Sequence, residues 1–200
     1  MKLTGVQPLS GDKYRLSFDG AEALIVSADI AVGLIGGERG VSDKEYAEWR
    51  AAADSLHCRE RAMRILSATP MSERGLYDRL VEKGEPERAA AETVAWLVSI
   101  GFLNDETYAA MLVRHCAAKG YGARRVRDEL YRRKVPREMW DAAMDEMPQQ
   151  DETIDRLLRS KLRSAEPDRA ELKRATDALA RRGFSWEEIR AALERLRDEE

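Results

Sequence analysis

The spacing of apolar residues along the chain changes from a strand-like to a helical period. In the first 30 residues, apolar positions such as Leu16 and Phe18 alternate with polar ones, and Asp19-Gly20 supplies turn chemistry between the runs. From Ser42, which opens a capping-box sequence, apolar residues recur at the spacing of an amphipathic helix. The pattern predicts a mainly α protein with a small β meander at its N-terminal end.

The helical part of the sequence repeats itself at intervals of 50 and then 49 residues. Each copy predicts two helices joined by a tight turn, and one further helix precedes each pair. Gly84 and Gly183 stand where the turn favours a left-handed backbone. Lys134 stands at this position in the second copy, where we expect it to cost a little strain. The matching stretches are residues 76–86, 126–136 and 176–185.

These elements predict a β meander followed by three tandem three-helix repeats that form an elongated, curved array. A three-helix unit of this length has a small core, so it gains stability by stacking on its neighbours. The predicted parts are residues 1–41 for the meander and its connection, 42–103 for a linker helix and the first repeat, 104–148 for the second repeat, and 149–200 for the third.

Charge is strongly segregated, although the net charge is only −3. Residues 114–137 carry nine Lys or Arg against two Asp or Glu, whereas residues 138–155 carry seven acidic residues and no basic one. Guanidinium groups bind phosphates or carboxylates, and interleaved tyrosines can stack on bases or fill notches on a protein. A solvated helix face is the alternative interpretation. The predicted partner-binding residues are Arg114, Lys119, Tyr121, Arg124, Arg125, Arg127, Tyr131, Arg132, Arg133 and Lys134.

Two His-Cys pairs, His57-Cys58 and His115-Cys116, contain the residue types that bind zinc in proteins. Neighbouring residues on a helix point about 100° apart, so the members of one pair do not readily share an ion. We therefore interpret them as ordinary residues of helix faces and predict no metal site.

Enzymatic activity has no visible basis in the sequence. The glycine-rich residues 33–40 lack the Gly-Lys-Ser/Thr ending of a phosphate-binding loop, and we interpret them as a flexible connection from the meander to the first long helix. The chain has two histidines and no nucleophile motif, and its carboxylates are scattered over exposed helices. We expect no catalytic residues and no cofactor.

The central sequence resembles the central repeat of the RecX family of bacterial regulatory proteins. The resemblance rests on residues 101–109, GFLNDETYA, and 119–130, KGYGARRVRDEL, and the meander and tandem repeats extend it over nearly the whole chain. It implies a non-catalytic protein that binds the RecA recombinase filament on single-stranded DNA and inhibits its ATPase, strand-exchange and coprotease activities. Such a protein would modulate homologous recombination, DNA repair and the SOS response. Lys134 departs from the family pattern, in which glycine is usual at this position.

Two other functions compete with this one. Three-helix units resemble helix-turn-helix domains, so the segment 123–133 would enter a DNA major groove in a DNA-binding protein that acts without the recombinase. Its basic face lacks a clear set of Asn or Gln residues for reading bases, and a pI near 5.7 is low for an independent DNA-binding protein. A plain scaffold of helical repeats is the third possibility, in which the basic segment would be incidental.

The remaining expectations concern location and assembly. No run of about 18 to 20 apolar residues is present, so we expect no membrane association. The two cysteines form no CxxC motif and fit a reducing compartment, so we expect a cytoplasmic protein. We also expect a monomer, with weak direct binding to single- or double-stranded DNA at most.

Overall fold

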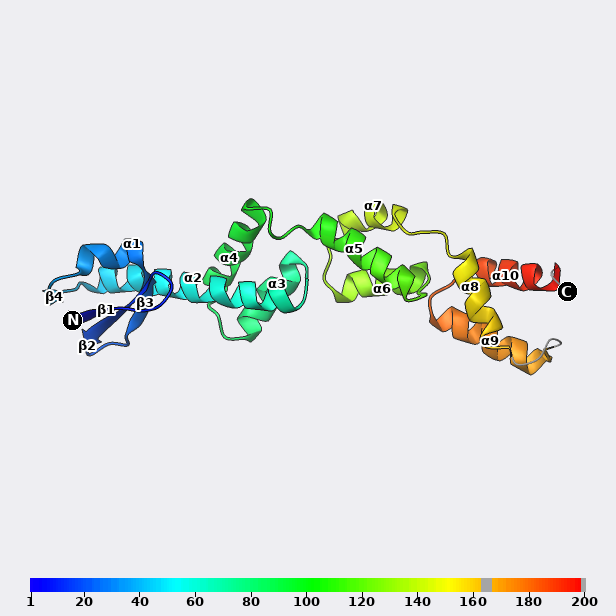
Figure 1. The fold of residues 1–200 in the computed structure, drawn as a ribbon, viewed down its shortest axis with the longest axis horizontal. Helices are drawn as coiled ribbons and strands as arrows, with labels where there is room; N and C mark the ends of the chain where they lie inside the picture. The colour runs from blue at the N-terminus through cyan, green and yellow to red at the C-terminus, as the bar shows by residue number, and fades with distance from the viewer. Residues whose placement is uncertain (163–166, 199–200) are drawn as a thin grey trace. The chain divides into compact units, whose positions relative to one another are not determined.

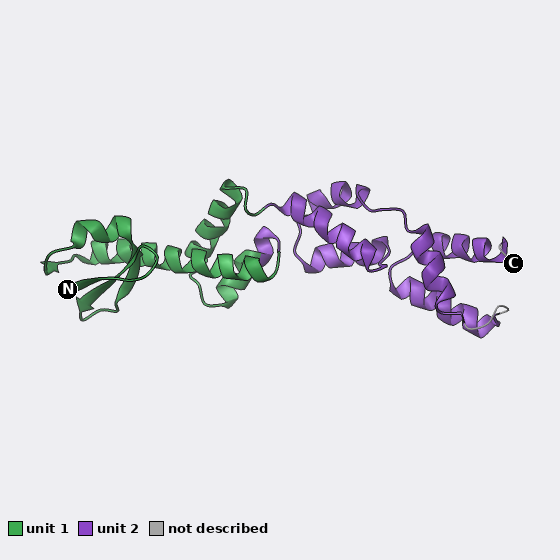
Figure 2. Cartoon of the chain, in the orientation of Figure 1, with its two compact units in different colours: residues 1–70, 76–103 green, residues 71–75, 104–200 purple. Residues whose placement is uncertain are grey.

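The computed structural model describes residues 1–162 and 167–198 (Figure 1). Two compact units make up the chain. The first contains residues 1–70 and 76–103, and the second contains residues 71–75 and 104–200 (Figure 2). Among the described residues, no helix is both long enough and apolar enough to span a bilayer.

A four-stranded antiparallel sheet forms the N-terminal end of the first unit, which confirms the predicted meander. Strand β2 lies between β1 and β3, and the short β4 pairs with the outer edge of β1. The connection predicted after the meander contains the short helix α1 (Ala28–Ala31), a 3-10 turn and β4, so it is more ordered than its glycine content suggested. The strands are β1 (Lys2–Pro8), β2 (Lys13–Asp19), β3 (Leu24–Ser27) and β4 (Arg39–Gly40).

Helix α2 (Asp43–Ala68) runs without a break from the sheet into the first repeat. The predicted capping box is present, because the Ser42 hydroxyl accepts from the Glu45 N–H at 3.2 Å and the Glu45 carboxylate accepts from the Ser42 N–H at 3.0 Å. The Glu45 carboxylate accepts from the Ser42 N–H, from the Ser42 hydroxyl and from Arg39, and these three bonds lower its pKa to about 2. The first part of α2 covers the sheet core with Tyr46, Trp49 and Ala53.

The first repeat combines the end of α2 with α3 (Glu73–Glu82) and α4 (Glu87–Ser99). Glu85 lies in the turn between α3 and α4 and is buried, with only 3% of its side chain exposed. Its carboxylate lies 2.9 Å from His57 Nδ1 and 3.0 Å from Arg61 Nε, both on α2. An ionic contact therefore joins the α3–α4 turn to α2, at a position where the later repeats carry an apolar residue.

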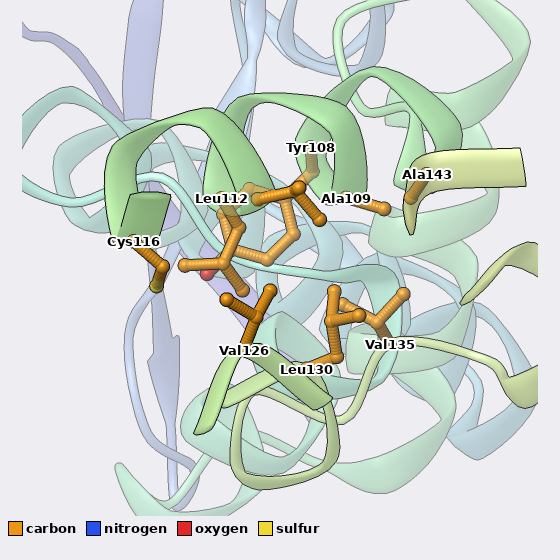
Figure 3. Close-up of a cluster of buried hydrophobic side chains, with 9 residues drawn as sticks. Tyr108, Ala109, Leu112, Cys116, Val126, Leu130, Val135 and Ala143 are labelled. Atoms are coloured by element: carbon orange, nitrogen blue, oxygen red, sulfur yellow. The ribbon is translucent and has the colours of Figure 1, made fainter. Parts of the chain in front are cut away.

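The second repeat packs its helices around one apolar core (Figure 3). Its elements are α5 (Asp105–Ala118), α6 (Ala123–Arg132), a 3-10 turn (Arg137–Met139) and α7 (Trp140–Asp145). Asn104 caps α5 as its sequence predicts, since its side chain accepts from the Thr107 N–H at 2.8 Å. The core side chains are Tyr108, Ala109, Leu112, Val113, Cys116, Val126, Leu130, Val135 and Ala143.

The third repeat contains α8 (Asp151–Arg159), α9 (Arg169–Arg181) and α10 (Trp186–Asp198). Arg195 on α10 donates two hydrogen bonds to the carboxylate of Asp155 on α8, from Nε at 3.0 Å and from Nη2 at 2.7 Å. This bidentate pair joins α8 to α10. The architecture of three tandem three-helix repeats is thereby confirmed. The core side chains are Ile154, Leu158, Ala175, Leu179, Phe184, Ile189 and Ala192.

The tight turns within the repeats share a left-handed residue. Gly84 has a φ of 87° and Gly183 a φ of 91°, and Lys134 takes the same kind of conformation with a φ of 59°. The predicted backbone geometry at Lys134 is therefore confirmed. The left-handed backbone conformation costs a residue that has a Cβ roughly 1 to 2 kcal/mol of conformational energy.

The second and third repeats are joined by backbone hydrogen bonds inside the second unit. The Gly122 N–H donates to the Arg182 carbonyl at 2.9 Å, and the Arg124 N–H donates to the Gly183 carbonyl at 3.1 Å. In return, Arg182 Nη1 donates to the Lys119 carbonyl at 3.0 Å. Unpaired groups at the end of α5 and the start of α6 thus find their partners in the α9–α10 turn.

Candidate functional site

Helix α6 separates its residues into a buried and an exposed side. Val126, Glu129 and Leu130 are buried against the rest of the second repeat. Because successive residues turn by about 100°, the opposite side consists of positions 124, 127, 128 and 131. These four residues, Arg124, Arg127, Asp128 and Tyr131, are all exposed.

Two of the arginines on α6 contact the buried carboxylate of the same helix. Glu129 lies 3.3 Å from Arg125 and 2.9 Å from Arg132. The Arg125 guanidinium also lies over the ring of Tyr121, 5.7 Å from its centre. Arg125 and Arg132 therefore balance the charge of Glu129, and part of their binding capacity is used within the repeat.

Arg124, Arg127 and Tyr131 form an exposed stripe along α6, and their side chains are available to a partner. Within residues 1–162 and 167–198, neither Arg124 nor Arg127 has a carboxylate within ion-pair distance. Tyr131 is 71% exposed, so its ring is not part of the core. Two guanidinium forks and one aromatic ring project from a helix whose backbone is fixed at both ends, which suits binding to phosphate or carboxylate groups.

The other predicted residues lie around this stripe. Arg114 on α5 pairs with Glu146, which follows α7, and Lys119 is exposed at the end of α5. Tyr121 is half-buried and packs against the core, so its ring is only partly accessible. The structure brings the α6 residues together and places Tyr121 against Arg125, whereas Arg114 and Lys119 lie on other parts of the repeat.

The far end of α6 is held by the segment before α3. The Ser72 hydroxyl donates to the Arg133 carbonyl at 2.6 Å, and Asp105 at the start of α5 accepts from the Glu73 N–H at 2.8 Å. Lys134 follows in its left-handed conformation, and its side chain is exposed, as is that of Arg133. The basic segment thus ends on a turn whose backbone is fixed.

A groove runs between α6 and α9 within the second unit, with a volume of about 440 Å³. Asp177 and Arg181, which form its wall on α9, are not among the residues predicted from the sequence to bind a partner. An offset of 49 residues relates Asp177 to Asp128 and Arg181 to Arg132, so the repeat shows that these positions are equivalent but does not show that α6 and α9 face each other. The groove is lined by Arg124, Arg125, Asp128, Asp177, Ala180, Arg181 and Gly183.

The two His-Cys pairs have structural surroundings. His57 contacts Glu85, while Cys58 and Cys116 are buried in the first and second repeats. Burial raises the pKa of both thiols, which disfavours the thiolate that metal binding and nucleophilic attack require.

The fold and this surface define a protein of tandem three-helix repeats in which one side of a basic helix, α6, is exposed on the second repeat. Family models for the RecX three-helix domains match the chain in order. The first domain matches residues 58–97, the second residues 104–144 and the third residues 149–193.

Curated relatives agree with these matches. The chain is 32% identical over 154 residues to a regulatory protein RecX of Vibrio cholerae, covering 74% of this chain and 98% of that protein. It is 26% identical over 183 residues to a regulatory protein RecX of Caldanaerobacter subterraneus, covering 90% and 92%. The chain belongs to the RecX family of regulatory proteins.

Solved structures share the fold. A crystal structure of a regulatory protein RecX aligns with a TM-score of 0.74 at 20% identity and covers 98% of both chains. A crystal structure of RecX from Lactobacillus salivarius aligns with a TM-score of 0.64 at 20% identity, covering 72% of this chain and 96% of that one.

Proposed function

We propose that this protein binds the RecA recombinase filament on single-stranded DNA and inhibits its ATPase, strand-exchange and coprotease activities. Membership of the RecX family supports the partner. The observation that carries the proposal is the exposed stripe of α6, where Arg124 and Arg127 are unpaired within the described residues and Tyr131 is exposed. In this role the protein acts by binding and performs no catalysis.

The proposed mechanism is steric and electrostatic. Arginine forks on the second repeat bind acidic protein groups or DNA phosphates of the filament, and the first and third repeats bridge neighbouring subunits. Several weak contacts on one chain reinforce one another, because each bound repeat raises the effective concentration of the next. The filament is then hindered in the changes that its activities require.

The test is a DNA-dependent ATPase assay of the recombinase with this protein titrated in. The triple variant R124A/R127A/Y131A should need about tenfold more protein for half inhibition, equivalent to about 1.4 kcal/mol. Its circular-dichroism spectrum and unfolding midpoint should be nearly unchanged, since these side chains are exposed.

A matched control comes from exposed arginines elsewhere. Arg88 on α4 and Arg190 on α10 already pair with Glu92 and Glu194, so the double variant R88A/R190A removes exposed guanidinium groups that are not available to a partner and should inhibit like the unmodified protein. Absence of inhibition by the unmodified protein at stoichiometric amounts would refute the proposed function. Full inhibition by the folded triple variant would refute the role of the stripe.

The competing function is helix-turn-helix DNA binding without the recombinase. Recognition helices contact bases with their N-terminal residues, whereas the N-terminal end of α6 is covered by the carbonyls of Arg182 and Gly183. We therefore expect weak duplex binding that falls steeply with salt, as counterion release requires. Fluorescence anisotropy with labelled duplexes measures this, and tight sequence-selective binding would favour the competing function.

A further inference from the structure

The groove between α6 and α9 carries an unusual arrangement of charges. Arg124 and Asp128 line it from α6, and Arg181 and Asp177 line it from α9. None of these four side chains has an ion-pair partner within the part of the chain that the structure describes. Each wall thus presents one free cation and one free anion to whatever enters the groove.

The walls of the groove are fixed before any partner binds. The Arg124 N–H donates to the Gly183 carbonyl, and the Gly122 N–H donates to the Arg182 carbonyl, so the start of α6 is fastened to the end of α9. Arg125, which also lines the groove, lies 3.3 Å from the Glu129 carboxylate. A preformed site loses less conformational entropy on binding than a flexible one does.

Within the proposed function, on which this inference rests, we infer that the groove binds a protein segment of the filament that carries both an acidic and a basic side chain. Arg124 and Arg181 bind the carboxylate through charge-assisted hydrogen bonds. Asp128 and Asp177 bind the cationic group. The two signs together fix the orientation of the segment, which a purely basic patch does not do.

Nucleic acid fits the groove less well. A DNA strand presents a negative phosphate at every nucleotide, so its backbone would bring phosphates close to Asp128 and Asp177. These carboxylates repel phosphate, whereas they attract a lysine or arginine of a protein. The same two aspartates therefore favour one class of partner and oppose the other.

Removing the two carboxylates should therefore have opposite effects on binding to a protein segment and on binding to nucleic acid. The double variant D128N/D177N removes both carboxylates and keeps side chains of similar size. We expect it to bind preformed recombinase filaments about fivefold more weakly, while its affinity for single-stranded DNA alone increases. Biolayer interferometry with immobilised filaments and with immobilised bare DNA measures both quantities.

The arginine wall is tested by R181E, which should weaken filament binding about tenfold. Arg174 provides the control, because it is exposed on the same helix two turns earlier and does not line the groove. R174E should stay within about twofold of the unmodified protein, and R181K, which keeps the charge, should retain more binding than R181E. Circular dichroism confirms that each variant is folded.

Two results would overturn the inference. Stronger binding of D128N/D177N to filaments as well as to bare DNA would identify the occupant as a phosphate backbone. Unchanged filament binding by folded R181E would show that the groove is not used. Both results differ from failure of the proposed function, in which the unmodified protein itself does not bind the filament.

Discussion

Gly122 and Gly183 lie against each other so closely that neither has room for a side chain. A Cβ atom built on Gly122 would lie 2.5 Å from the carbonyl carbon and oxygen of Gly183, and one built on Gly183 would overlap the backbone of Arg125. The second and third repeats therefore meet backbone against backbone. This contact positions the groove between α6 and α9.

Replacing either glycine with alanine should destabilise the second unit. G122A forces backbone atoms apart and should lower the free energy of unfolding by roughly 1 to 3 kcal/mol, the usual cost of overpacking. G183A should cost at least as much, because its φ of 91° adds conformational strain. Urea unfolding followed by circular dichroism measures both effects.

Gly33 is the matched control for these two variants. No atom lies within 4 Å of a Cβ built on it, and its φ is not in the left-handed region. G33A should therefore change the free energy of unfolding by less than about 0.5 kcal/mol. Equal stability of G122A and G33A would contradict the close packing of the two repeats.

Replacing Lys134 with glycine should stabilise the protein. The left-handed conformation costs a residue with a Cβ about 1 to 2 kcal/mol, and the entropy that glycine gains in the unfolded chain cancels about half of this relief. K134G should thus raise the free energy of unfolding by about 0.5 to 1 kcal/mol. Thermal unfolding is the measurement.

The first repeat offers the reverse exchange. Gly84 has a φ of 87°, and a Cβ built on it meets no atom within 4 Å, so G84K introduces conformational strain without a clash. It should lower the free energy of unfolding by about 1 kcal/mol. The hypothesis of strain fails if K134G and G84K shift stability in the same direction.

Asp105 should make stability fall as the pH rises. Burial raises the pKa of this carboxyl, which is 3% exposed, against the opposing hydrogen bond from the Glu73 N–H. Burial, followed by the charge of Asp105, also raises the pKa of Glu73. Since the folded state holds these protons more tightly, the contribution is complete below about pH 4 and is lost as the pH rises through the folded pKa values.

The variant D105N isolates this effect. Its amide oxygen still accepts from the Glu73 N–H but carries no charge, so the stability of D105N relative to the unmodified protein should increase from about pH 3 to about pH 7. Urea unfolding of both proteins at each pH provides the difference, in which the other carboxylates cancel. A flat or falling difference would disagree with a raised pKa at Asp105.

Both cysteines should resist modification in the folded protein. Cys58 and Cys116 are buried, and burial raises the pKa of each thiol, so the reactive thiolate is scarce and shielded. Ellman's reagent should react at least about a hundredfold faster after unfolding in guanidinium chloride than before. Rapid reaction of one thiol per folded chain would show that one of these sites opens to solvent.

The sequence predicts the order of secondary structure because that order depends on local patterns. Helical periodicity, the Ser42 capping box and the turn residues Gly84 and Gly183 are each visible within a few positions. Lys134 is the instructive case. Only comparison with the other two repeats indicates its left-handed backbone, since its own residue type disfavours that conformation.

The candidate site could be predicted only in part. A run of basic residues does not reveal which arginines meet the buried Glu129, because that depends on the side of α6 that faces the core. Asp177 and Arg181 lie about 40 positions beyond Arg137, the end of the basic segment, and only folding brings them beside it. The burial of Glu85 could not be predicted from its neighbours in the sequence either, because its partner His57 lies on another helix, α2.

The bonds from Gly122 and Arg124 to the α9–α10 turn also affect the order in which the repeats finish folding during synthesis. The carbonyls of Arg182 and Gly183 accept hydrogen bonds from the N–H groups of Gly122 and Arg124. The ribosome adds these two acceptor residues about 60 residues after the two donor residues. At about 5 to 20 residues per second, the first turn of α6 waits several seconds for its partners. On a growing chain, the second repeat is therefore finished together with the third and not before it.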